Sequence, residues 1–197
     1  MKPFRSVNPQ RTCSLKYKTY QAYKVYLRSD FGTNCGYCAD ADAFSGGKNG
    51  FHIDHFRPLN HFSKLKCDYT NLVYACSYCN IAKSDDWPCL GLTTTYHKGQ
   101  GYIDPCDADF VNHFERYDTG KIFPKTDVGK YMFIQLKLGL RRHELIWLTS
   151  QLFTKLEEVK VLYELHKHSD KADQIARKLS DLYVEYSKYK GLFEETV

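Results

Sequence analysis

The sequence predicts an α+β fold, with a small core of two strands and one helix that is framed by helices and followed by a C-terminal antiparallel helical hairpin. Short strands are expected at residues 51–56, where Pro58 stops the first strand, and at residues 72–75. A short helix is expected at about residues 77–85. From Val128 onward, apolar residues recur at the spacing of α-helices. Strand, loop, strand and helix therefore come first, and long helices follow.

Composition excludes two broad classes of protein. Hydrophobic residues make up 43% of the 197 residues and charged residues 26%, which fits neither a disordered chain nor a membrane protein. No run of about 18 apolar residues occurs, and the first residues lack the apolar stretch of a signal peptide. We therefore expect a soluble, cytoplasmic protein. The net charge of +5 permits a polyanionic partner but does not require one.

Residues 1–33 are expected to form an N-terminal helical segment. Apolar residues recur at helical spacing over residues 14–28, Ser14 can cap the start, and Gly32 follows the end. The lysines of this helix form either a solvated basic face or contacts to nucleic-acid phosphates. Residues 34–92 then form the core, and residues 93–197 form a mixed segment and a helical region that we expect to be one compact unit with it.

Two Cys-x-x-Cys pairs bracket the core. They are Cys35 with Cys38 and Cys76 with Cys79, and the second pair falls at the expected turn from strand to helix. In a protein of the cytosol, eight cysteines indicate metal binding rather than disulfides. Two such pairs have the spacing of a four-thiolate zinc site. We therefore expect these four cysteines to hold one structural zinc ion.

Between the two pairs lies the doublet Asp54-His55, on the first expected strand. Side chains alternate along a strand, so the two residues point to opposite faces unless the strand end twists them together. Asn71 precedes the second strand, and Asn80 follows Cys79. The joint pattern is much more specific than an isolated Asp-His or Cys-x-x-Cys.

These residues resemble the HNH endonuclease family, whose nuclease core is the ββα-metal fold. The resemblance implies that His55 is a general base, that Asp54 and Asn80 bind a catalytic divalent ion, and that Asn71 orients His55. The zinc-containing branch of the family places its cysteines as this chain does. Many members carry His where this chain has Asn80, and the Asn version also occurs.

The chemistry of phosphodiester hydrolysis explains these residue types. An imidazole with a pKa of about 6.5 can accept a proton from water at neutral pH. Mg²⁺ or Mn²⁺ prefers oxygen ligands, which a carboxylate and an amide supply. A four-thiolate zinc ion has no open position and is therefore structural. Arg57 and Lys83 are candidate phosphate contacts or solvated surface residues, and His52 either touches metal or phosphate or is structural.

The C-terminal half is expected to be mainly helical. Residues 93–127 are rich in turn formers, with a short strand in GYIDP, a helical turn or two in DADFVNHFERY, and an extended stretch in DTGKIFP. A helix from Val128 to about Gly139 comes next. Two apolar stripes then predict a hairpin of long helices: Leu145, Leu148, Leu152, Leu156, Val159 and Leu162, followed by Ile175, Leu179, Leu182 and Tyr186.

The order HIDHFRP, NLVYACSYCN, IDP, DTGKIFP and KLGLRRHEL resembles the small stand-alone HNH proteins of bacterial antiphage defence. Their type is the nuclease partner of an ABC-type ATPase in Septu systems, also found beside retrons. The resemblance implies a cytoplasmic effector that a partner ATPase holds in check. We expect a metal-dependent nuclease acting on DNA. Two alternatives stay open, a nuclease that cleaves RNA such as tRNA and a non-catalytic, zinc-stabilised binding module.

Overall fold

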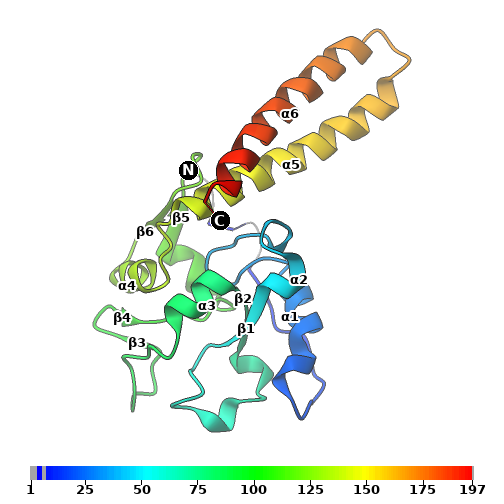
Figure 1. Ribbon diagram of the computed structural model, residues 1–197. Helices are drawn as coiled ribbons and strands as arrows, with labels where there is room; N and C mark the ends of the chain where they lie inside the picture. Colours follow the sequence, from blue (N-terminus) through cyan, green and yellow to red (C-terminus); the bar gives the residue numbers. More distant parts are fainter. Residues whose placement is uncertain (1–3, 6–7, 197) are drawn as a thin grey trace. The chain divides into compact units, whose positions relative to one another are not determined.

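The computed structural model describes residues 4, 5 and 8–196. Its contacts divide the chain into two compact units, Met1–Leu140 and Arg141–Val197. This division lies at neither of the boundaries that we expect from the sequence, near residues 33 and 92. The described part combines helices with small antiparallel sheets, as expected for an α+β fold (Figure 1).

The described regular elements are as follows. The strands are β1 (Phe51–His55), β2 (Leu72–Cys76), β3 (Tyr96–His97), β4 (Gln100–Gly101), β5 (Phe114–Arg116) and β6 (Ile122–Pro124). The α-helices are α1 (Lys24–Asp30), α2 (Gly47–Gly50), α3 (Ser77–Lys83), α4 (Asp127–Gln135), α5 (Arg141–His166) and α6 (Ala172–Glu194). Short 3-10 helices lie at Tyr20–Tyr23, Asp42–Phe44, Ser63–Leu65, Tyr69–Asn71 and Ala108–His113.

The strand, strand and helix expected between residues 51 and 85 are confirmed. β1 and β2 pair antiparallel, with Asp54 opposite Val73 and His55 opposite Leu72. All five residues of β2 are buried, so this strand has the core on both sides. α3 starts directly after β2, where the Cys76 sulfur accepts a hydrogen bond from the backbone N–H of Cys79 and caps the helix.

The N-terminal helix starts later than the sequence predicts. Its first turn is the 3-10 segment Tyr20–Tyr23, so the start expected at Ser14 is wrong. The buried hydroxyl of Tyr23 accepts a hydrogen bond from the backbone N–H of Tyr17 and donates one to the carbonyl of Leu15. A side chain therefore satisfies backbone groups that helix hydrogen bonds would otherwise use.

Residues 93–140 agree with the sequence in part. The 3-10 helix and β6 confirm the helical turn and the extended stretch, whereas the strand expected in GYIDP includes only Gly101. The Thr126 hydroxyl caps α4 by accepting a hydrogen bond from the N–H of Gly129. α4 ends at Gln135 rather than near Gly139, because Lys137 takes a left-handed backbone conformation with φ 54°.

The second unit is the two-helix hairpin expected from the apolar stripes. α5 and α6 run alongside each other and are joined by residues 167–171 (Figure 1). The rings of Phe153 and Tyr186 lie 6.1 Å apart across the two helices, and Leu152, Leu156 and Val159 of the first stripe are buried. Among the described residues, no helix is both long enough and apolar enough to span a membrane.

Candidate active site and metal centre

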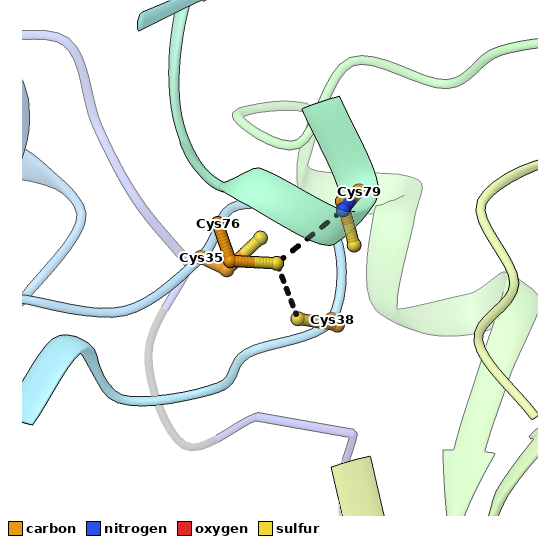
Figure 2. A group of neighbouring side chains, drawn as sticks. All are labelled: Cys35, Cys38, Cys76 and Cys79. Carbon is orange, nitrogen blue, oxygen red and sulfur yellow. Dashed lines mark hydrogen bonds between the residues drawn. The ribbon is translucent and has the colours of Figure 1, made fainter. Parts of the chain in front are cut away.

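The four expected cysteines come together in the core of the first unit. Cys35 and Cys38 lie on the turn before residue 40, and Cys76 and Cys79 lie at the end of β2 and the start of α3 (Figure 2). All four are buried, and their sulfur atoms lie within 4.8 Å of one another. The sulfurs of Cys38 and Cys76 are 3.8 Å apart, almost twice the length of a disulfide bond.

This donor set fits a structural zinc ion. Tetrahedral zinc with Zn–S bonds of about 2.3 Å places its sulfur ligands about 3.8 Å apart. Burial and the neighbouring thiols raise the pKa of Cys38 well above its ordinary value. A cluster of buried thiolates therefore needs a cation, and a divalent ion at its centre would supply the missing charge.

Gly36, the second residue of the first Cys-x-x-Cys turn, has no space around it for a side chain. Gly36 donates a backbone hydrogen bond to the carbonyl of Tyr74 on β2, at 2.8 Å. A Cβ atom on Gly36 would lie 2.7 Å from the ring of Phe31 and 2.8 Å from a methyl group of Val73. The absence of a side chain therefore lets the turn lie directly against the strand.

Asp54 is held by two donors in the protein interior. Its side chain is 7% exposed and accepts a 2.5 Å hydrogen bond from the hydroxyl of Tyr37. The ammonium group of Lys83 forms an ion pair with the same carboxylate at 3.2 Å and donates to the carbonyl of His55 at 2.9 Å. Lys83 is fully buried in this internal ion pair, so it is not the solvated surface residue of the second alternative, and its contact with phosphate stays a prediction.

His55 ends β1 and is held through one ring nitrogen. Its Nε2 lies 2.9 Å from the carbonyl oxygen of Lys66. Because a carbonyl only accepts hydrogen bonds, Nε2 carries the proton and Nδ1 holds the lone pair of the neutral ring. The Tyr20 ring packs edge-on against the imidazole, with 4.8 Å between ring centroids.

His55 and Asp54 border the same shallow depression, of about 210 Å³. Both residues of the doublet therefore border one depression, despite the alternation of side chains along β1. Asn80 of α3 also borders this depression. The Asn80 amide nitrogen donates to Nδ1 of His52 at 3.0 Å, and this bond does not use the amide oxygen. A carboxylate and an amide oxygen beside one depression suit a hard divalent ion.

Asn71 supports the loop after β1. Its buried amide accepts a hydrogen bond from the backbone N–H of Arg57 at 2.8 Å and donates to the Arg57 carbonyl at 3.1 Å. Among the described hydrogen bonds, the His55 ring contacts the carbonyl of Lys66, and the role of Asn71 in orienting His55 stays a prediction. Asn71 therefore fixes the chain two residues beyond His55.

Arg57 lies beside the site in an aromatic setting. Its guanidinium carbon is 5.4 Å from the centre of the Phe62 ring and 5.3 Å from that of Trp87. The guanidinium also donates a hydrogen bond to the carbonyl of Thr93, at 3.4 Å. The role of Arg57 and that of exposed His52 in binding phosphate stay predictions.

Sequence reasoning missed Tyr37 and Lys66. Tyr37 stands inside a Cys-x-x-Cys pair, so its proximity to the zinc site was visible, but its partner on β1 was not. Lys66 contributes a backbone carbonyl, which carries no signal in the residue type. The burial of Lys83 did have a signal, because Lys83 lies four residues after buried Cys79 and on the same face of α3.

Replacing Asn71 with alanine should lower the free energy of unfolding by about 2 kcal/mol, because it leaves two backbone groups of Arg57 without their partners. Urea denaturation measures the change. The matched control is Asn60→Ala, which removes one hydrogen bond to Asp85 at the surface and should cost less than about 0.5 kcal/mol. Equal losses in the two variants would contradict the role given to Asn71.

Two antiparallel strands and a helix hold a buried four-cysteine cluster and an Asp-His pair beside an open depression. Residues 35–86 match the family model described as HNH endonuclease. This segment contains the four cysteines, Asp54, His55, Asn71 and Asn80. The match supports metal-dependent nuclease activity and covers less than half of the chain. No curated protein and no solved structure matches the chain significantly.

Proposed function

We propose that this protein is a metal-dependent endonuclease that hydrolyses phosphodiester bonds in DNA. The observation that carries the proposal is the state of His55 at the depression. Its Nε2 lies on the Lys66 carbonyl, so Nδ1 can act as a base, and His55 borders the depression together with Asp54 and Asn80. A positioned imidazole and two oxygen ligands at one open site match the needs of phosphodiester hydrolysis.

In this mechanism, Nδ1 of His55 accepts a proton from the water that attacks phosphorus. Asp54 and Asn80 would hold a Mg²⁺ or Mn²⁺ ion, which neutralises charge on the phosphate and on the departing 3′ oxygen. The guanidinium of Arg57, and the imidazole of His52, would contact phosphates of the nucleic acid. The four cysteines stabilise the scaffold through zinc and take no part in the chemistry.

The resemblance of the motif order to defence nucleases supports two finer proposals. The first is that the nuclease is an effector of a bacterial antiphage system and acts in the cytoplasm. The second is that an ABC-type ATPase is its partner subunit. Co-expression with an ABC-type ATPase, followed by co-purification, tests the second proposal. Purification of the nuclease without the ATPase would contradict it.

The nuclease proposal predicts metal-dependent cleavage by the purified, zinc-loaded protein. Plasmid DNA, single-stranded DNA and tRNA are incubated with the protein in Mg²⁺, in Mn²⁺ or in excess EDTA, and the products are resolved on gels. Cleavage of DNA that EDTA abolishes is the expected result. Cleavage of tRNA alone would favour an RNA nuclease. Binding to any of the three without cleavage would favour a non-catalytic module.

A further inference from the structure

The residue between the first two zinc-site cysteines touches the proposed catalytic carboxylate. Tyr37 is fully buried, and its hydroxyl donates a 2.5 Å hydrogen bond to Oδ2 of Asp54. Tyr37 lies between Cys35 and Cys38, within a turn that the hydrogen bond from Ala39 N–H to the Cys35 carbonyl closes. The position of this hydroxyl is therefore set by the turn that binds the metal.

The second donor to Asp54 comes from the other half of the cysteine cluster. Lys83 lies one helical turn after Cys79 on α3, and its ammonium group is 3.2 Å from Oδ2 of Asp54. The Asp54 carboxylate therefore has two buried donors, one inside the first Cys-x-x-Cys pair and one on the helix that follows the second pair. Since Lys83 also binds the carbonyl of His55, the two residues of the doublet share this support.

We propose that Tyr37 is a positioning residue, through which the cysteine cluster fixes the Asp54 carboxylate in the orientation that binds the catalytic divalent ion. The inference rests on the proposed function, because it assigns Asp54 as a ligand of that ion. It adds a coupling between the two metal sites. The four-cysteine site determines the conformation of the turn at residues 35–38. The hydroxyl of Tyr37, which lies in this turn, then determines the orientation of the Asp54 carboxylate.

Physical chemistry favours a large effect from one hydroxyl. A hydrogen bond to an ionised carboxylate is stronger than one between neutral groups, and a phenol has a single donor in a fixed direction. Removing a partner that orients a metal ligand typically weakens metal binding by about 10-fold to 100-fold. Loss of Tyr37 leaves Lys83 as the described side-chain donor to Asp54, so the carboxylate can turn about this remaining contact.

Tyr37→Phe tests the inference, because it removes the hydroxyl and keeps the buried ring. Binding of Mn²⁺ to the zinc-loaded protein is measured by electron paramagnetic resonance of the free ion, with Asp54→Ala defining the site. We expect Tyr37→Phe to raise the Kd for Mn²⁺ by about 10-fold and to keep one zinc ion per chain. Cleavage should recover largely at saturating Mn²⁺, since the ligands themselves are present.

Tyr74→Phe is the matched control. Tyr74 is another fully buried tyrosine of the same core, and its hydroxyl donates to a buried carboxylate, Asp42, at 2.8 Å. Neither residue borders the depression. The control removes the same chemical group at a comparable loss of stability and should leave the Kd for Mn²⁺ unchanged.

The inference is overturned if Tyr37→Phe binds Mn²⁺ as tightly as the wild type, or if Tyr74→Phe weakens binding equally. It is also overturned if wild-type binding of Mn²⁺ does not depend on Asp54. These readouts need no substrate. A protein that shows the expected Mn²⁺ affinities but cleaves no nucleic acid would therefore contradict the proposed function and leave the role of Tyr37 standing.

Discussion

Replacing His55 with alanine should lower the rate of phosphodiester cleavage by about 10²-fold or more, the loss expected when a general base is removed. The substitution leaves the four cysteines and the Asp54 carboxylate in place. The lost contacts are the bond to the Lys66 carbonyl, on an exposed residue, and the edge of the Tyr20 ring. Zinc content and fold should therefore be those of the wild type. Single-turnover cleavage with zinc analysis of the same samples measures both properties.

The matched control for this experiment is His97→Ala. His97 is exposed on β3 and does not border the depression, so its loss should leave the rate unchanged. Wild-type rates in a folded, zinc-loaded His55→Ala protein would refute the general-base assignment. A loss of rate that comes with lost zinc would instead show that His55 supports the fold.

Replacing Cys76 with serine should remove zinc from the protein and unfold the core of the first unit. Structural zinc contributes on the order of 10 kcal/mol of binding free energy, whereas whole domains are stable by about 5–15 kcal/mol. Cys76 also caps α3, and serine can supply the same cap, so the expected loss comes from the missing zinc ligand. The zinc content per chain is measured by inductively coupled plasma mass spectrometry. Amide hydrogen exchange measures the unfolding of residues 34–86.

Cys67→Ser controls for the loss of a thiol as such. Cys67 lies in the loop between β1 and β2, and its sulfur donates to the carbonyl of Lys18 at 3.3 Å. This variant should keep one zinc ion and wild-type exchange rates. One zinc ion per chain in Cys76→Ser, or none in carefully prepared wild-type protein, would rule out the four-thiolate site.

The core around the cysteines could be predicted because its signals are local. Metal-ligand spacing places Cys76 and Cys79 at a turn, and the all-apolar run before them suits a buried strand. The two long C-terminal helices could also be predicted from the sequence. An apolar stripe that repeats over many helical turns stays recognisable even where single positions depart from it. The helix start at Ser14 failed because the partner of that backbone, the Tyr23 hydroxyl, is a tertiary contact.

The parts of the site that could not be predicted are contacts between residues that lie far apart in the sequence. The type and spacing of Asp54, His55 and Asn80 indicate their chemistry, and the depression that they share is formed by β1 and α3. The spacing of Lys83 from Cys79 suggests that Lys83 is buried, but its ion pair with Asp54 is visible only in the fold. Asn71 has the expected place in the chain, but its hydrogen bonds go to Arg57.

The two Cys-x-x-Cys turns carry unequal amounts of sequence information. In the first turn, Gly36 is constrained by the volume around it and Tyr37 by the hydroxyl bond to Asp54. In the second turn, Ser77 is half-buried and Tyr78 is 39% exposed. Packing therefore restricts the two middle residues more strongly in the first turn than in the second. A search pattern that allows any two residues between the cysteines of both turns ignores Gly36 and Tyr37. These two residues connect the four-cysteine site to Asp54.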